Sequence, residues 1–75
     1  MITRFGLAML VARLEKERSY DLCVRVALAL GYSLVEKSEA FHLDVPGSRF
    51  LSVYFSKDAL VDDLLEAGES VLSQL

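Results

Sequence analysis

The sequence predicts one small α+β domain over residues 1–75, in the order helix, helix, strand, strand, strand, helix. Apolar side chains recur at helical spacing before Gly31 and after Ser56, whereas the period between these residues is close to two. The apolar content of 53 % is enough to offset the entropy lost when a short chain folds. The simplest architecture for this order is an antiparallel three-stranded meander packed against helices.

The first helix is expected over residues 3–18, where good helix formers dominate. Thr3 is its expected N-cap. Its apolar stripe consists of Leu7, Leu10, Val11 and Leu14. Glu17 and Arg18 are expected to lie on the solvated side of the helix.

The second helix is expected over residues 20–30, with Gly31 as its left-handed end. A single helix over residues 3–30 is the alternative. Apolar side chains surround the second helix almost completely, and only Asp21 and Arg25 interrupt them. A helix that is apolar all round is buried on more than one side.

Three strands are expected over residues 32–37, 41–45 and 50–55, where apolar alternation and β-branched or aromatic residues prevail. The segment 46–48 has the composition of a turn because it combines proline, glycine and serine. The first turn, near Ser38, leaves the register of the first two strands open.

The second strand pair allows a prediction of register. A three-residue loop places Leu43 opposite Leu51 and Phe41 opposite Val53, so that apolar residues meet. A two-residue loop is the alternative and is less favourable, because it pairs His42 with Leu51. The inner face is then expected to carry Phe41, Leu43, Val45, Leu51, Val53 and Phe55. The outer face is expected to carry His42, Asp44, Phe50, Ser52 and Tyr54.

The last helix is expected to follow Ser56, its N-cap. Gly68 interrupts the helix and is expected to bend it or to end a first segment. The helix has one apolar stripe, formed by Leu60, Val61, Leu64, Leu65, Val71, Leu72 and Leu75.

Negative charge is concentrated in the second half of the chain. The net charge is −3, but residues 1–38 carry six basic and four acidic side chains, whereas residues 39–75 carry two basic and seven acidic ones. Most of these acids lie on the last helix, at Asp58, Asp62, Asp63, Glu66 and Glu69. Four of them, all except Asp63, step along one side of the helix. Such a column imitates a phosphate backbone, or else it is an ordinary solvated face.

No pattern in the sequence specifies a reaction. Cys23 is expected within an apolar helix and His42 on the polar face of a strand, so a cysteine–histidine pair is not expected. Zinc requires three or four clustered ligands, and phosphate binding requires a glycine-rich loop. We therefore expect no enzyme, no catalytic residue, no metal and no cofactor.

The apolar runs, the net charge and the cysteine count also bear on the expected partners and compartment. No unbroken apolar run, residues 26–30 included, is long enough to cross a bilayer, and the acidic balance favours neither direct nucleic-acid binding nor membrane binding. A single cysteine, Cys23, suits a reducing compartment, so a cytoplasmic protein is expected.

In size, acidity and lack of catalytic groups, the chain resembles the small inhibitors that phages use against bacterial defence nucleases, such as anti-CRISPR proteins. This resemblance is one of profile and implies no individual residue. It implies a non-enzymatic protein-binding module that occupies a surface of another protein, such as a basic nucleic-acid-binding effector. The expected contact residues are the five acids of the last helix together with Phe50 and Tyr54. A homo-oligomeric structural or adaptor protein, for instance a homodimer, is the alternative, because the second helix and outer sheet face carry surplus apolar residues.

Overall fold

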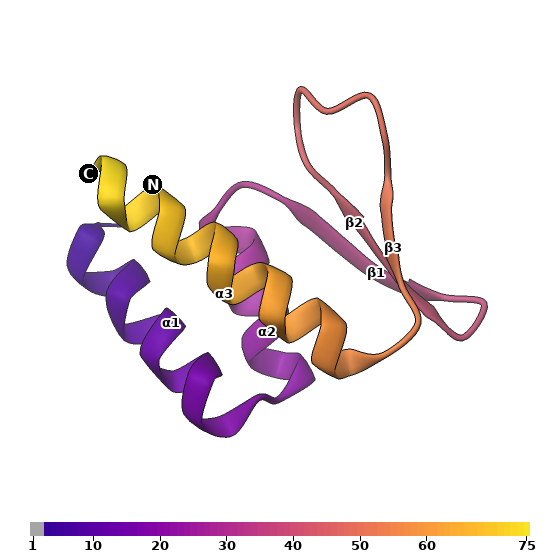
Figure 1. Cartoon of the computed structure of the whole chain (residues 1–75), viewed down its shortest axis with the longest axis horizontal. Helices are drawn as coiled ribbons and strands as arrows, with labels where there is room; N and C mark the ends of the chain where they lie inside the picture. The colour runs from indigo at the N-terminus through magenta and orange to yellow at the C-terminus, as the bar shows by residue number, and fades with distance from the viewer. Residues whose placement is uncertain (1–2) are drawn as a thin grey trace.

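The computed structural model describes residues 3–75 and confirms the predicted fold class and order of elements. The strands form an antiparallel sheet in the order β1-β2-β3, and the helices pack on one side of it (Figure 1). The bounds are α1 (Arg4–Glu17), α2 (Tyr20–Ala29), β1 (Ser33–Lys37), β2 (Ala40–Asp44), β3 (Ser52–Tyr54) and α3 (Lys57–Gln74).

Two caps separate α1 from α2 and exclude one continuous helix over residues 3–30. Arg18 ends α1 in the left-handed conformation, with φ of 50°, and its amide donates to the carbonyl of Leu14. The hydroxyl of Ser19 then accepts from the amide of Leu22 at 3.3 Å and begins α2. The expected cap at Thr3 and the left-handed stop at Gly31, with φ of 82°, are both present.

The core lies between α2, its two neighbouring helices and the sheet. The predicted burial of α2 on more than one side is confirmed, because it packs against α1, α3 and β1. Tyr20, at the start of α2, also packs on Phe41 of β2, with ring centroids 5.4 Å apart. The buried side chains of this core are Leu14, Leu22, Cys23, Val26, Ala27, Leu43, Leu60, Val61 and Leu64.

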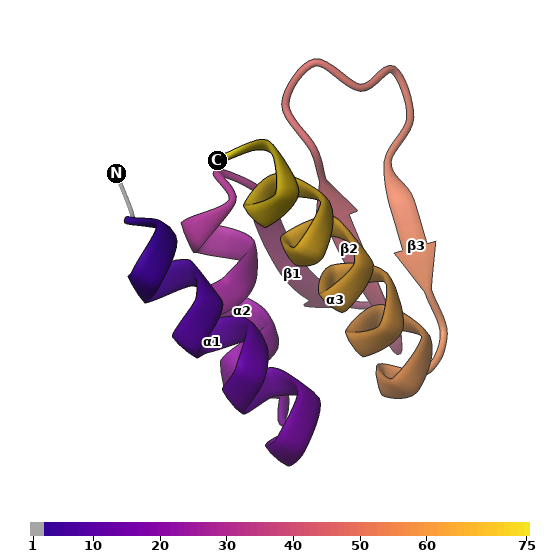
Figure 2. The same ribbon diagram turned by 60° about the vertical axis from the view of Figure 1, so that its left-hand side comes forward.

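Helices α1 and α3 lie side by side and approach closely at Gly68 (Figure 2). A Cβ atom built on Gly68 would lie 2.6 Å from Cγ2 of Val11, which is closer than van der Waals contact allows. The expectation that Gly68 ends a first helical segment is wrong, because α3 continues without interruption to Gln74. Gly68 allows α1 to approach α3 closely, and it does not end α3.

We predict that Gly68→Ala destabilises the protein, although alanine is the better helix former by about 1 kcal/mol. The added methyl group collides with Val11, and such overpacking costs roughly 1–3 kcal/mol. Urea unfolding of a double-mutant cycle with Val11→Ala measures the effect. Gly68→Ala should be stabilising in the Val11→Ala background, and destabilisation of equal size in both backgrounds would contradict the collision.

The first strand pair has a two-residue turn at Ser38 and Glu39, both with positive φ, of 55° and 61°. This turn resolves the register that the sequence left open, because it pairs Lys37 with Ala40 and Val35 with His42.

The predicted register of the second pair is wrong by one residue. Phe41 pairs with Tyr54, and Leu43 pairs with Ser52. A shift of one residue exchanges the two faces of a strand. The predicted inner residues Leu51, Val53 and Phe55 are 52, 40 and 83 % exposed.

The connection between β2 and β3 explains the difference. It spans residues 45–51 and is therefore longer than a tight hairpin loop. A turn at its start is closed by the amide of Ser48 donating to the carbonyl of Val45, and the Ser48 hydroxyl then contacts the backbone of Phe50. A wide loop of this kind does not fix the pairing of the two strands.

Candidate functional site

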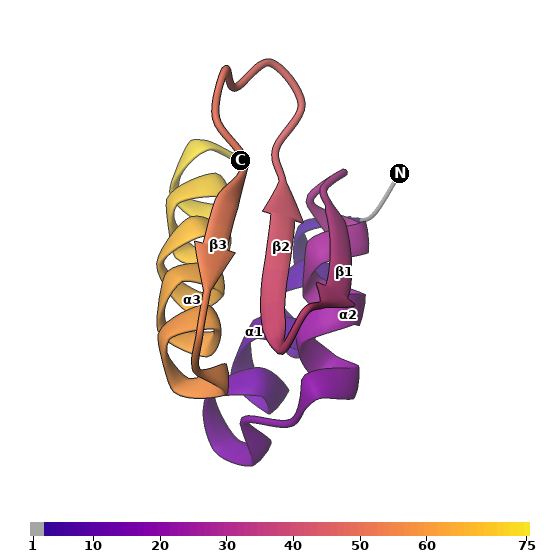
Figure 3. The same ribbon diagram turned by 90° about the vertical axis from the view of Figure 1, so that its right-hand side faces the viewer.

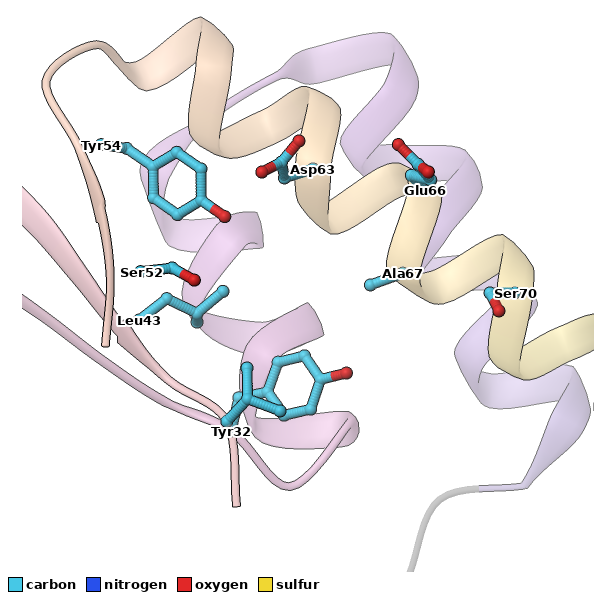
Figure 4. Close-up of a pocket in the computed structure, with 9 residues that line it drawn as sticks. Tyr32, Leu43, Ser52, Tyr54, Asp63, Glu66, Ala67 and Ser70 are labelled. Carbon is cyan, nitrogen blue, oxygen red and sulfur yellow. The ribbon is translucent and has the colours of Figure 1, made fainter. Parts of the chain in front are cut away.

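A groove of about 420 Å³ lies between α3 and the inner face of β2 and β3. Its walls combine aromatic rings, hydroxyl groups, apolar side chains and two carboxylates (Figure 4). The lining residues are Tyr32, Leu43, Val45, Ser52, Tyr54, Asp63, Glu66, Ala67 and Ser70. The groove is therefore a mixed surface with a negative side on α3.

The register of β3 and the helical repeat of α3 together produce the groove. Pairing with Leu43 and Phe41 turns Ser52 and Tyr54 toward α3. On α3, residues three, four and seven positions after Asp63 fall on the same side of the helix and also line the groove. Sequence reasoning missed Ser70 and Tyr32 as groove residues, although Ser70 shares the helical stripe of Asp63.

Tyr54 and Asp63 face each other across the groove (Figure 4). Partial burial of the ring, followed by the nearby Asp63 carboxylate, raises the pKa of the Tyr54 phenol to about 12. The phenol of Tyr54 is therefore neutral at physiological pH.

The stability that Tyr54 contributes should depend on pH in a defined direction. Because the folded state raises the pKa of the phenol from 10.0 to about 12, the contribution is complete below pH 10 and is lost as the pH rises toward 12. We expect a loss on the order of 1 kcal/mol, after allowing for the partial exposure of the ring.

Urea unfolding of the wild type and Tyr54→Phe at pH 9 and pH 11.5 measures this contribution. Other groups titrate in both proteins, so the difference between their unfolding free energies isolates Tyr54. A difference that does not change with pH would contradict the environment described for the phenol.

The acidic side chains on α3 lie in three different surroundings. The first two of these acids form ion pairs with Arg18. Nη2 of Arg18 lies 2.9 Å from Oδ1 of Asp62 and 3.5 Å from Oδ1 of Asp58. The hydrogen bond with Asp62 is the main cause that raises the pKa of Arg18, so the guanidinium remains charged. Asp58 and Asp62 therefore join the α1–α2 junction to α3.

Asp63 and Glu66 instead line the groove, and within residues 3–75 neither of them takes part in an ion pair. Glu69 also has no ion pair among these residues, but it lies on the exposed surface outside the groove. The four carboxylates of the predicted column thus differ in their surroundings: Asp58 and Asp62 pair with Arg18, Glu66 lines the groove, and Glu69 is exposed to solvent.

The two predicted aromatic contacts do not share a surface. Phe50 lies in the connection 45–51 and is 79 % exposed, whereas Tyr54 is half-buried in the groove. The expectation that Tyr54 lies on the outer face of the sheet is wrong, because the observed register turns it toward α3. The observed register does, however, place Tyr54 next to Asp63, which is one of the predicted contact residues.

Cys23 and His42 lie in different parts of the fold. Cys23 is fully buried among the helices, and burial raises the pKa of its thiol, which opposes formation of the nucleophilic thiolate. His42 lies on the outer side of the sheet, where Nε2 is 3.2 Å from the carbonyl oxygen of Lys37. The structure thus does not bring the thiol and the imidazole together.

Two further findings concern residues 3–75 alone. Within this range, no group of three or more histidine, cysteine, aspartate or glutamate side chains is arranged to hold a metal ion. None of the helices in the same range has both the length and the apolar character required to cross a membrane.

Comparisons with protein-family models, with curated proteins and with solved structures find no match to this chain. The groove and the other exposed surfaces of the domain are therefore the features that point to a function.

We predict that Cys23 reacts with a thiol reagent only through opening of the fold. Its burial and raised pKa suppress the thiolate in the folded protein. Absorbance after addition of Ellman's reagent should show slow labelling in buffer and complete labelling within the mixing time in urea. Equally fast labelling in both conditions would contradict the buried position.

Proposed function

We propose that this chain is a non-enzymatic protein-binding module whose groove receives an arginine or lysine side chain of a basic partner. The observation that carries the proposal is the pair of groove carboxylates, Asp63 and Glu66, which have no ion pair within residues 3–75. The rings of Tyr32 and Tyr54 line the same groove.

The chemistry of the groove suits a long basic side chain. Carboxylates accept charge-assisted hydrogen bonds from a guanidinium or ammonium group, and tyrosine rings attract the same cation through their faces. Leu43, Val45 and Ala67 provide apolar contacts for the alkyl stem. The volume of about 420 Å³ lies at the lower end of the range of ligand pockets, which suits one side chain better than a large cofactor.

The charge distribution supports a basic partner as well. The excess of acidic residues in residues 39–75 includes the groove and the exposed Glu69. Such a field speeds encounter with a positively charged surface. An inhibitor that occupies the nucleic-acid groove of a bacterial defence nuclease is the most concrete form of the proposal, and it depends on the resemblance in size and acidity.

Glu69 provides a control position for Glu66. Both are glutamates on α3, three residues apart, and only Glu66 lines the groove. We predict that Asp63→Asn combined with Glu66→Gln weakens binding of N-acetyl-arginine amide at least fivefold, equivalent to about 1 kcal/mol. Glu69→Gln should leave binding unchanged within twofold.

Amide chemical shifts recorded during a titration measure this binding, and the uncharged isostere N-acetyl-citrulline amide is the ligand control. Shifts should concentrate at groove residues with arginine and be absent with citrulline. The same three proteins serve as baits in a bacterial lysate, where a partner is retained by the wild type and Glu69→Gln and lost from the groove double variant. Equal effects of the two ligands, or of the two sets of variants, would contradict a specific cation site.

A further inference from the structure

The outer face of the sheet is uncovered, because the helices pack only on the opposite side (Figure 3). Val35 of β1 is 54 % exposed on this face, and Leu51 and Val53 are exposed beside it. Phe55, two residues after Val53, is also largely exposed. Exposed apolar residues that gather on one face of a small domain are typical of an interaction surface.

This face is hollowed and carries one charge of each sign at opposite ends. The hollow of about 460 Å³ is lined by Ser33, Val35, Lys37, Ser38, His42, Asp44 and Leu51. Within residues 3–75, neither Lys37 nor Asp44 takes part in an ion pair. The lining of the hollow thus includes one positive and one negative side chain, although the chain has a net charge of −3.

The strand register places these residues symmetrically. Val35, His42 and Val53 form a central row across the three strands. Lys37 lies two residues from this row in one direction, and Asp44 lies two residues from it in the other. On β3, Leu51 and Phe55 likewise lie two residues to either side of Val53.

We propose that two copies of this chain stack through the outer faces of their sheets, around a two-fold axis that crosses the strands at the central row. Such an axis exchanges the two ends of the face. Lys37 of each copy then lies over Ser33 of the other, and Asp44 of that copy is on the neighbouring strand, within reach of the long lysine side chain. Leu51 of each copy meets Phe55 of the other, and Val53 meets its own equivalent. The contact is isologous, as in most dimers of identical chains, and the two sheets pack as in a β-sandwich.

A second copy is the occupant that the charges favour. A partner with a strongly charged surface would leave either Lys37 or Asp44 unmatched, whereas the same face turned by the two-fold axis brings an opposite charge to the strand next to each of them. The acidic α3 helices lie on the far side of each sheet, which keeps the most negative surfaces apart. The dimer also leaves both grooves open, so it is independent of the function proposed above.

Charge reversal tests the proposal by sedimentation equilibrium from 5 to 500 μM. The wild type should form dimers in this range. Lys37→Asp and Asp44→Lys should each weaken the dimer at least tenfold, because each places two pairs of like charges across the interface. An equimolar mixture of the two variants should associate as tightly as the wild type, since only the mixed pair brings opposite charges together at both positions.

Lys16→Asp is the matched control, because it makes the same charge change at an exposed residue of α1 and should leave the dimer intact. Far-ultraviolet circular dichroism confirms that each variant is folded. A wild type that is monomeric at 500 μM overturns the proposal, as does a pair of reversals that dimerise as tightly as the wild type. A mixture no tighter than its components overturns the two-fold arrangement. The groove double variant should dimerise normally, which separates this result from failure of the cation site.

Discussion

The pairing of β2 with β3 determines both exposed surfaces of this domain. Because Leu43 pairs with Ser52 and Phe41 with Tyr54, the polar residues of β3 face α3 and its apolar residues face outward. A shift of one residue would bury Val53 beneath α3 and turn Tyr54 away from Asp63. The groove would then lose its aromatic wall, and the outer face would lose its apolar centre. One choice of hydrogen-bond partners thus creates two surfaces of opposite character.

The helices could be predicted because their signals are local. Thr3 and Ser56 cap helices within three residues of themselves, and Gly31 adopts the conformation that ends α2. The register of β3 could not be predicted in the same way. The rule that apolar residues pair on a common face assumes a wholly apolar layer above the sheet, but α3 places Asp63 and Glu66 along part of that layer. A polar strand face is stable there.

The candidate site shows the same contrast between local and distant information. The acidic residues of α3 are evident in the sequence. The sequence does not show which of them pair with Arg18 and which line the groove. Arg18 comes from the junction of α1 and α2, far from Asp58 and Asp62 in the chain, and its left-handed backbone forms part of that junction. Only the packed helices bring these charges together. Which carboxylates of α3 are left without an ion pair within residues 3–75 is therefore determined by the tertiary structure.

The close approach of Val11 to Gly68 also affects the order in which the domain is assembled during synthesis. The contact joins the first helix to the last, and α2 packs against both. A nascent chain that ends before α3 has no partner for one whole side of α2, so its apolar residues stay in contact with water or with a chaperone. The fold is therefore completed only after α3 leaves the ribosome, and synthesis of the final helix sets the moment at which aggregation-prone surface disappears.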